Sequence, residues 1–421
     1  MASGTILNKF WRGRNQLVYR SQVRRLTLHE HQSHDILRQF GIPVPLGKVA
    51  TTSAEAEAIV KEFNKTCIIK PQIVGNDVKA GAANGGFQDR FRQADDAEAA
   101  GKIAAYLLSH NSEARESSGG ERLTNKLFIT EMIKYEASWY LAITFDRENN
   151  CPIIIASKRG GVDIETMVKQ YPELLHTFRF GYAGGITPEV VEKVSRCLDA
   201  STKERDCLQK ILGRLYKIFT AKDATLLEIR SLARSHGGTL TCLDARISFD
   251  DAASKRQDDV FSLRDTMHEI SEEVEAEKYG LVYVKMGGNI GNVVNGAGLA
   301  MATNDAIALH GGASANFLDA GGQATKDTMV KAFEIILRDA RVKTILVNIY
   351  GGITRGDMIA ESILGAAKEL GPLKVPMVVR LQGTNSELGL KILEEADLGL
   401  YTEADFGKAA EKAVELARDS A

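Results

Sequence analysis

The sequence has few cysteines, almost no net charge and no long apolar run. Its 5 cysteines are scattered without a CxxC pair, which disfavours a zinc site or a disulfide framework and agrees with a reducing compartment. The formal net charge is −2, so nothing indicates a nucleic-acid partner. No apolar segment approaches the roughly 18–20 residues that cross a bilayer, so we expect no membrane insertion. With 44% hydrophobic and 26% charged residues, the composition is that of an ordinary globular protein.

The first 29 residues contain no aspartate or glutamate. Their basic side chains are Lys9, Arg12, Arg14, Arg20, Arg24 and Arg25. Apolar side chains between them can form one stripe of a helix. A basic, acid-free amphipathic start is typical of a mitochondrial transit peptide, although a plain basic tail would have the same composition. We expect residues 1–25 to be this peptide, with cleavage near residues 22–26, and the mature protein to lie in the mitochondrial matrix.

The 421 residues predict about two to four domains, at roughly 100–200 residues each. The first part mixes helix-like and strand-like segments. We expect helices at residues 30–40, 53–63, 94–109, 188–198 and 203–219, and strands at 67–74, 127–132, 138–145, 152–157, 224–230 and 239–247. Pro43 and Pro45 begin an extended segment. The last two strands are joined by SHGG, which is a hairpin signal.

The character of the sequence changes near residue 280. Residues 250–280 are charged and predict a long helix or a linker, with a domain boundary near 271–281. Beyond them, we expect strands at 281–285, 290–294, 315–318, 344–350, 375–381 and 397–400, and helices at 296–309, 325–339, 357–370, 386–395 and 403–418. This alternation predicts an α/β domain with a doubly wound parallel sheet.

Three glycine-containing turns follow predicted strands of this second part. They are VVNGAGLAMAT (293–303), NFLDAGGQAT (316–325) and NIYGGITRGD (348–357). In each, glycine lets backbone amides approach an anion, and the N-terminus of the next helix adds partial positive charge. A single turn of this kind can serve packing alone. Three at the carboxyl ends of parallel strands line one crevice, which predicts a ligand site.

The first part contains a possible cluster of charged side chains. Lys70 ends a buried strand, where an unpaired ammonium is costly, and either a ligand phosphate or an internal carboxylate would satisfy it. Glu228 and Arg230 share a strand face, and Asp244 lies on the partner strand of the hairpin. The pattern alone is equally compatible with a metal or phosphate site and with an ion-pair network.

Longer motifs give the chain a family resemblance. They are LTLHEHQSHDILRQFGIPVP (26–45), RGGVDIETM (159–167), FDDAASKRQDDVFSLRD (249–265), GNIGNVVNGAGLAMATNDAIALHGG (288–312), ANFLDAGG (315–322) and LVNIYGGITRGDMIA (346–360). These segments are similar to succinate–CoA ligase β subunits, and the resemblance runs from residue 26 to the end. It implies an ATP-grasp domain at residues 26–270 and a flavodoxin-like CoA-ligase domain at residues 281–421.

The family resemblance also implies an activity and a partner. Members form succinyl-CoA reversibly from succinate, CoA and ATP or GTP in the tricarboxylic acid cycle, using magnesium. A histidine on a partner α subunit carries the phosphoryl group between two active sites. No such histidine motif is recognisable in this chain, so the resemblance implies an α/β complex. The GIPVPLGKVA start resembles ADP-forming relatives, which favours ATP/ADP over GTP/GDP.

The same resemblance assigns site residues. Glu228 would orient the phosphohistidine, and Asp244 would be a magnesium ligand. Lys70 would contact nucleotide phosphates, and Glu131 would lie at the adenine hinge. The residues that would hold the succinate or phosphate end are Asn295, Gly352, Ile353 and Thr354.

Four positions depart from the family pattern, all in the ATP-grasp part. The phosphate loop reads GNDVK (75–79), one residue shorter, without its arginine and with an aspartate. A hinge glutamate is replaced by Ser138, and the proline after the second metal ligand by Ser231. The second ligand, an asparagine in the family, is Arg230, which has no acceptor for magnesium. We predict that Arg230 pairs with Asp244 and that nucleotide binding depends little on magnesium.

Three interpretations follow from these departures. The chain is an active succinate–CoA ligase subunit with an altered nucleotide site, a non-catalytic β-like subunit that binds and regulates α, or a ligase for another small acid such as malate or citrate. The intact glycine turns agree with all three. The altered metal position favours the second.

Overall fold

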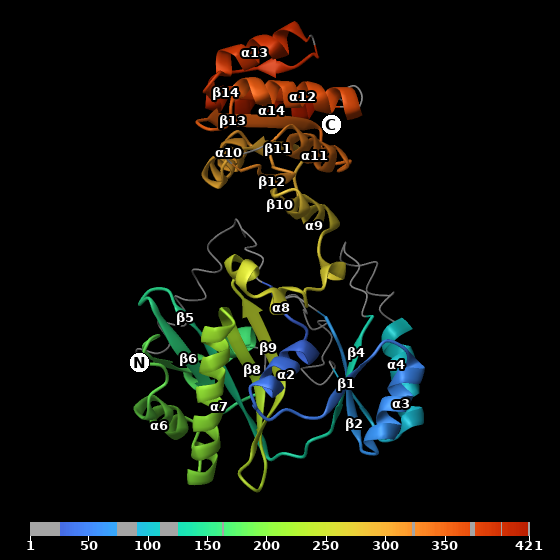
Figure 1. The fold of residues 1–421 in the computed structure, drawn as a ribbon, viewed down its shortest axis with the longest axis vertical. Coiled ribbons are helices and arrows are strands. Elements are labelled where there is room, and N and C mark those ends of the chain that lie inside the picture. Colours follow the sequence, from blue (N-terminus) through green and yellow to red (C-terminus); the bar gives the residue numbers. More distant parts are fainter. Residues whose placement is uncertain are drawn as a thin grey trace. The chain divides into compact units, whose positions relative to one another are not determined.

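The computed structural model describes residues 26–73, 91–109, 125–161, 164–321, 325–370, 375–396 and 398–419. The chain divides into two compact units, Met1–His268 and Glu269–Ala421 (Figure 1). The expected transit peptide 1–25 and the loop 75–79 lie outside the described residues. Among the helices that are described, none has the length and apolar character needed to cross a membrane.

Unit 1 contains a five-stranded antiparallel sheet of order β7-β6-β5-β8-β9. Its strands are β5 (Ala137–Asp146), β6 (Cys151–Ser157), β7 (His176–Arg179), β8 (Ala224–Arg234) and β9 (Leu240–Phe249). One face packs against α2 (Glu30–Gln39), α6 (Pro188–Cys197) and α7 (Thr202–Ala221). The other face packs against the shorter α5 (Ile164–Gln170). The predicted SHGG hairpin is confirmed, since Ser235 N donates to Thr239 O at 3.0 Å.

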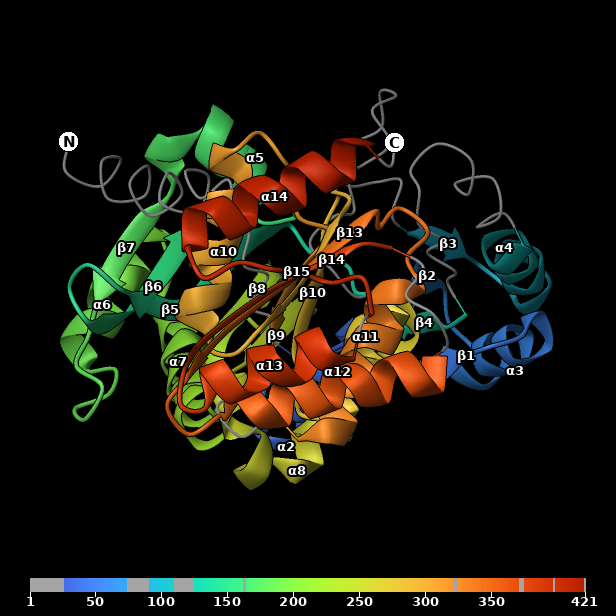
Figure 2. The same ribbon diagram turned by 90° about the horizontal axis from the view of Figure 1, so that it is seen from above.

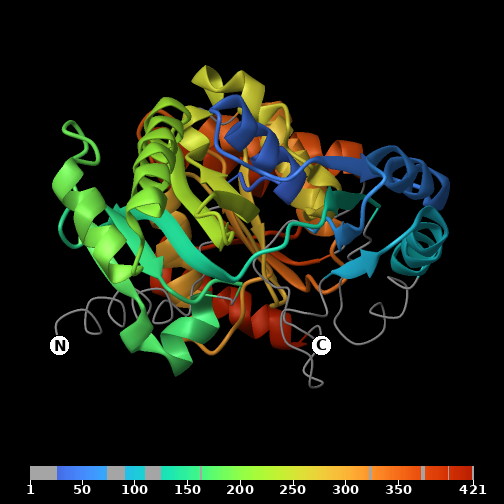
Figure 3. The same ribbon diagram turned by 90° about the horizontal axis from the view of Figure 1, so that it is seen from below.

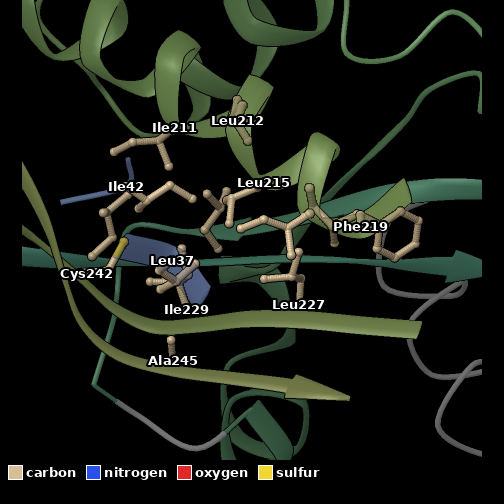
Figure 4. Packing of buried hydrophobic residues seen from close by; sticks show 14 of the residues in the cluster. Leu37, Ile42, Ile211, Leu212, Leu215, Phe219, Leu227, Ile229, Cys242 and Ala245 are labelled. Atoms are coloured by element: carbon tan, nitrogen blue, oxygen red, sulfur yellow. The ribbon is translucent and has the colours of Figure 1, made fainter. Parts of the chain in front are cut away.

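Helix α7 illustrates how the sequence builds this layer. Ser201 and Glu204 form a capping box at its start, which satisfies backbone amides that have no partner within the helix. Its buried apolar residues recur every three or four positions: Leu208, Ile211, Leu212, Leu215, Ile218 and Phe219. Figure 4 shows Ile211, Leu215 and Phe219 of this stripe on the side of Leu227 and Ile229 of β8. Each such burial contributes about 1.5–3 kcal/mol, so the stripe sets which face of α7 lies on the sheet.

A second, four-stranded antiparallel sheet completes unit 1, with order β1-β4-β2-β3. Its strands are β1 (Gly47–Ala50), β2 (Cys67–Pro71), β3 (Arg92–Ala94) and β4 (Leu127–Glu131). Helices α3 (Ser53–Phe63) and α4 (Ala97–Ser109) lie side by side against it (Figure 3). The predicted strand 67–74 is shorter than expected and ends at Pro71.

Strands β1, β3 and β7 and helix α5 were not predicted as such. All three strands lie at sheet edges, have at most four residues, and contain no more than one buried residue each. A short edge strand needs no strict apolar alternation, because only part of it faces the core. The period-2 signal is therefore weak.

Residues 250–280 do not form one long helix. They form short 3₁₀ helices at Asp251–Arg256 and Thr266–His268, and the α-helices α8 (Asp258–Phe261) and α9 (Ser271–Lys278). Asp250 and Asp265 accept the backbone amides of residues 252 and 267, at 3.1 Å each. Aspartates that bind nearby backbone amides favour new turns over continuation of a helix.

Unit 2 contains a six-stranded sheet of order β10-β12-β11-β13-β14-β15. Its strands are β10 (Val282–Lys285), β11 (Ile290–Val294), β12 (Asn316–Asp319), β13 (Thr344–Gly351), β14 (Met377–Gly383) and β15 (Tyr401–Thr402). All neighbours are parallel except β10, which is antiparallel at the edge. The five parallel strands have the flavodoxin-like order 2-1-3-4-5, which confirms the predicted fold. The last strand lies a few residues beyond the predicted 397–400.

The helices that follow the parallel strands cover both faces of this sheet. Their bounds are α10 (Ala297–Leu309), α11 (Lys326–Leu337), α12 (Gly356–Leu370), α13 (Ser386–Glu395) and α14 (Phe406–Asp419). Helices α10 and α14 pack on one face, and α11, α12 and α13 on the other (Figure 2). Because β11 and β13 are neighbours but lead to helices on opposite faces, the sheet has its topological switch point at their carboxyl ends.

Candidate functional site

Lys70 lies near the end of β2, and its ammonium is bound by the chain itself. Nζ donates to Glu30 Oε1 of α2 at 2.5 Å and to the carbonyl oxygen of Leu243 in β9 at 2.8 Å. The two side chains are only 16% and 12% exposed. The internal carboxylate, one of the two alternatives for Lys70, is therefore the partner in this structure. The sequence pattern did not identify Glu30, which lies 40 residues earlier in the chain.

Arg230 and Asp244 form the predicted ion pair. Arg230 Nη2 donates to Asp244 Oδ1 at 2.7 Å. The pairing of β8 with β9 is irregular here, because Ile229 pairs with Ala245 whereas Ser231 already pairs with Asp244. A β-bulge of this kind re-aims a side chain. The guanidinium is thus directed along the sheet onto the neighbouring strand.

The two ion pairs act on one another electrostatically. Burial would lower the pKa of Arg230, but the carboxylates of Asp244, Glu228 and Glu30 outweigh burial and raise it. Burial would raise the pKa of Asp244, but Arg230 and Lys70 outweigh it and lower that pKa. For Glu30 burial dominates and raises the pKa despite Lys70. These side chains therefore form one cluster of buried and half-buried charges.

Glu228 lies on β8 in the same cluster and is only 5% exposed. The hydroxyl of Tyr140, on the adjacent strand β5, donates to Glu228 Oε1 at 2.8 Å. This bond orients a carboxylate that would otherwise be costly to bury. The sequence pattern did not single out Tyr140, since it is one of many apolar and aromatic residues in β5.

Glu131 lies at the end of β4, where the resemblance implies the adenine hinge. Lys65 Nζ donates to its Oε2 at 2.6 Å, and Leu46 N donates to its Oε1 at 3.1 Å. Burial would raise the pKa of Glu131, but these two donors outweigh it and lower the pKa. The carboxylate is therefore ionised and held by residues that lie just before β1 and β2.

A magnesium ion does not fit the position that the resemblance implies. Magnesium requires oxygen ligands in near-octahedral geometry, and Arg230 supplies none. The Oδ1 atom of Asp244 already accepts a hydrogen bond from Arg230. Among the described residues, no group of three or more His, Cys, Asp or Glu side chains could hold a metal ion.

Asn295 follows β11 at the switch point of unit 2 and is bonded across to β13. Its Nδ2 donates to the carbonyl oxygen of Tyr350 at 3.0 Å, and its Oδ1 accepts from Tyr350 N at 2.9 Å. This reciprocal pair extends the ladder between the two strands by one rung. Asn295 thereby positions the turn that leads from β13 into α12.

In the second glycine turn, the carboxylate of Asp319 accepts hydrogen bonds from backbone amides of two turns. Asp319 Oδ1 accepts from Gly296 N at 2.6 Å and from Gly321 N at 2.8 Å. The carboxylate thus lies at the N-terminus of α10, where it complements the positive end of the helix dipole. Two of the three glycine turns are joined through this residue.

The third turn contains the predicted loop Gly352, Ile353 and Thr354. Thr384 Oγ1 donates to Gly352 O at 2.9 Å, and Ile353 is 80% exposed whereas Thr354 is buried. The N-terminus of α12 follows directly. Its first turn includes Asp357, whose pKa is lowered to about 2 by Arg355. The loop is thus held at its ends and open at its centre.

Comparisons with known proteins agree with this division of the chain. A family model described as an ATP-grasp domain matches residues 27–234, and a second described as CoA-ligase matches residues 293–414. By structure, the chain is similar to ATP citrate lyase from Methanothrix soehngenii, solved with citrate and coenzyme A, with a TM-score of 0.71. That similarity covers 93% of this chain and 100% of the other at 16% identity, and it supports the fold alone.

Curated relatives are closer in sequence. The chain is 39% identical to the mitochondrial ADP-forming succinate–CoA ligase β subunit of Neurospora crassa, over 95% of this chain and 90% of that protein. It is 40% identical to the ADP-forming β subunit of Oryza sativa subsp. japonica, over 93% of each. It is 38% identical to the GDP-forming β subunit of Dictyostelium discoideum, over 93% of this chain and 94% of that protein. The chain therefore belongs to the mitochondrial type of the succinate–CoA ligase β-subunit family of acid–CoA ligases, with an ATP-grasp domain followed by a CoA-ligase domain.

Proposed function

We propose that the chain works with an α subunit in the mitochondrial matrix to form succinyl-CoA reversibly from succinate, CoA and a nucleoside triphosphate, more readily ATP than GTP. The observation that carries this proposal is the 39% identity to an ADP-forming β subunit over 95% of the chain. Residues 26–270 would form the nucleotide domain and residues 281–421 the CoA-ligase domain. Residues 1–25 would be removed on import.

In this proposal the acyl end of the reaction takes place at the switch point of unit 2. The turn Gly352–Thr354 and the N-terminus of α12 would hold the succinate carboxylate or the phosphate, because backbone amides at a helix N-terminus favour an anion. Asn295 would fix that turn through its two bonds to Tyr350. A fixed orientation of this kind increases the reaction rate, since the reacting groups start close together.

The phosphoryl group would travel on a histidine of the α subunit. Glu228 would accept an N–H of that imidazole, with its carboxylate held in place by Tyr140 at 2.8 Å. Lys70 would contact the nucleotide phosphates after leaving Glu30, and Glu131 would lie near the base. Lys70, Glu228 and Glu131 each have an internal partner already. The nucleotide and the phosphohistidine therefore have to compete with these partners.

The test is reconstitution of the complex. The mature chain from residue 26 is co-expressed with the α subunit of the same organism, and turnover is measured with succinate, CoA and either ATP or GTP. We expect succinate- and CoA-dependent turnover that is faster with ATP, and little with malate or citrate. Glu228→Gln should lower the rate about 10²-fold, whereas Glu148→Gln, at an exposed turn, should not.

A well-formed α/β complex without turnover on any of the three acids would refute the ligase. Turnover that required malate or citrate would instead identify a different acid substrate.

A further inference from the structure

We propose that unit 1 carries a metal-independent ionic lock where the family resemblance implies a magnesium site. The lock consists of the Lys70–Glu30 and Arg230–Asp244 pairs, together with the bond from Lys70 to Leu243. This proposal depends on the proposed function in one respect, which is that the cluster lies at the phosphate end of the nucleotide site.

The lock joins the two sheets of unit 1. Lys70 belongs to β2 of the four-stranded sheet, whereas Leu243 lies on β9 of the five-stranded sheet, 173 residues away in sequence. Glu30 belongs to α2, which packs against the five-stranded sheet. A single ammonium thus connects both sheets through a carboxylate and a carbonyl group. No ligand is needed for this connection.

Arg230 supplies a second positive charge to the cluster, because Lys70 alone cannot balance its carboxylates. The cluster has carboxylates at Glu30, Glu228 and Asp244, against cations at Lys70 and Arg230. With Arg230 in place, a divalent ion would have to displace a guanidinium that lies 2.7 Å from Asp244 Oδ1. In Arg230→Asn, Lys70 alone would balance the carboxylates of Glu30, Glu228 and Asp244, and the new amide oxygen would add a ligand beside Asp244, which together favour a divalent cation. The arginine therefore excludes the metal by its positive charge and by its hydrogen bond to the Asp244 oxygen that the metal would need.

The Lys70–Glu30 pair has to open when a nucleotide binds. Magnesium alone should neither bind nor tighten unit 1, and a nucleotide has to draw Lys70 away from Glu30 before its phosphates gain a cation.

Thermal unfolding of the full chain tests this without reference to activity. The melting temperature (Tm) is measured with Mg²⁺, with Mn²⁺ and with EDTA, in wild type and in Arg230→Asn. We expect no metal effect in wild type. Arg230→Asn should lose about 4–8 °C, because it leaves buried carboxylates unpaired, and either metal should restore part of that loss.

Two further variants serve as controls. Arg230→Lys keeps the charge and should remain insensitive to metal. Arg234→Asn removes the pair between Arg234, which lies on the same strand as Arg230, and Glu204 of α7. It should be destabilised without any metal response, since Asp244 keeps its partner.

A metal-dependent rise in the Tm of wild type would overturn the proposal, and this measurement stands even if Arg230→Asn fails to fold. A folded Arg230→Asn whose Tm is unmoved by both metals would also overturn it. Failure of the proposed function would look different, because absent turnover in the α/β complex leaves these melting temperatures unchanged.

Discussion

His34, on α2, is a histidine that this fold requires in its neutral form. Its side chain is fully buried, and neither ring nitrogen has a hydrogen-bond partner among the described residues. The ring packs edge-on against Phe128, with centroids 5.3 Å apart. Burial, followed by the positive charge of Lys70, lowers its pKa from 6.5 to about 3. We therefore predict that mild acid destabilises unit 1 through this residue.

Proton linkage gives the direction and the size of this change in stability. In the unfolded chain His34 takes up a proton below pH 6.5, whereas the folded state resists protonation until about pH 3. The unfolded state therefore binds more protons, and stability falls as the pH falls through this window. Between pH 8 and pH 5 the loss from His34 alone is about 2 kcal/mol, which corresponds to about 4–8 °C in Tm. His29 and His31, whose pKa values are also lowered by burial, add in the same direction.

The assay is urea unfolding at a series of pH values between 8 and 5. His34→Leu cannot take up the proton and leaves no ring nitrogen unpartnered, so it should lose less stability than wild type on going from pH 8 to pH 5. The difference should be about 2 kcal/mol. His176→Gln, at an exposed strand position, should keep the wild-type slope. If His34→Leu and wild type had parallel stability curves, the buried neutral histidine would not be the cause.

Three other substitutions probe the remaining contacts. Tyr140→Phe removes the donor to Glu228 at 2.8 Å and should cost about 1–3 kcal/mol, measured by urea unfolding; a change within error would mean that the carboxylate finds another donor. Gly383→Ala should cost about 2–3 kcal/mol in the same assay, because φ there is +89° and a Cβ would lie 2.0 Å from the Gly351 carbonyl oxygen; wild-type stability would contradict this close approach. Asn295→Leu loses both bonds to the backbone of β13, so steady-state assays of the α/β complex should give kcat/KM about 10²-fold lower with Tm reduced only slightly; unchanged kinetics would exclude a positioning role.

Local patterns alone determined much of the fold. The alternation of strands and helices after residue 280 predicted the parallel sheet, because each βα unit has its own hydrophobic period. The SHGG signal predicted the β8–β9 hairpin, and with it the Arg230–Asp244 pair, since hairpin partners are neighbours in sequence and in space. The departure at Arg230 became visible only through the resemblance to the family, and arginine cannot act as a magnesium ligand in any fold.

Tertiary structure alone decided which charged groups became partners over long distances. Nothing local to Lys70 indicates that Glu30 and the Leu243 carbonyl satisfy it, 40 and 173 residues away. In the same way, Asp319 at the N-terminus of α10 and Tyr140 beside Glu228 depend on strand order. Periodicity shows which face of an element is buried, but a buried charge is satisfied by whichever group the packing brings within about 3 Å. That choice depends on how separate elements pack together, which no single segment of the sequence encodes.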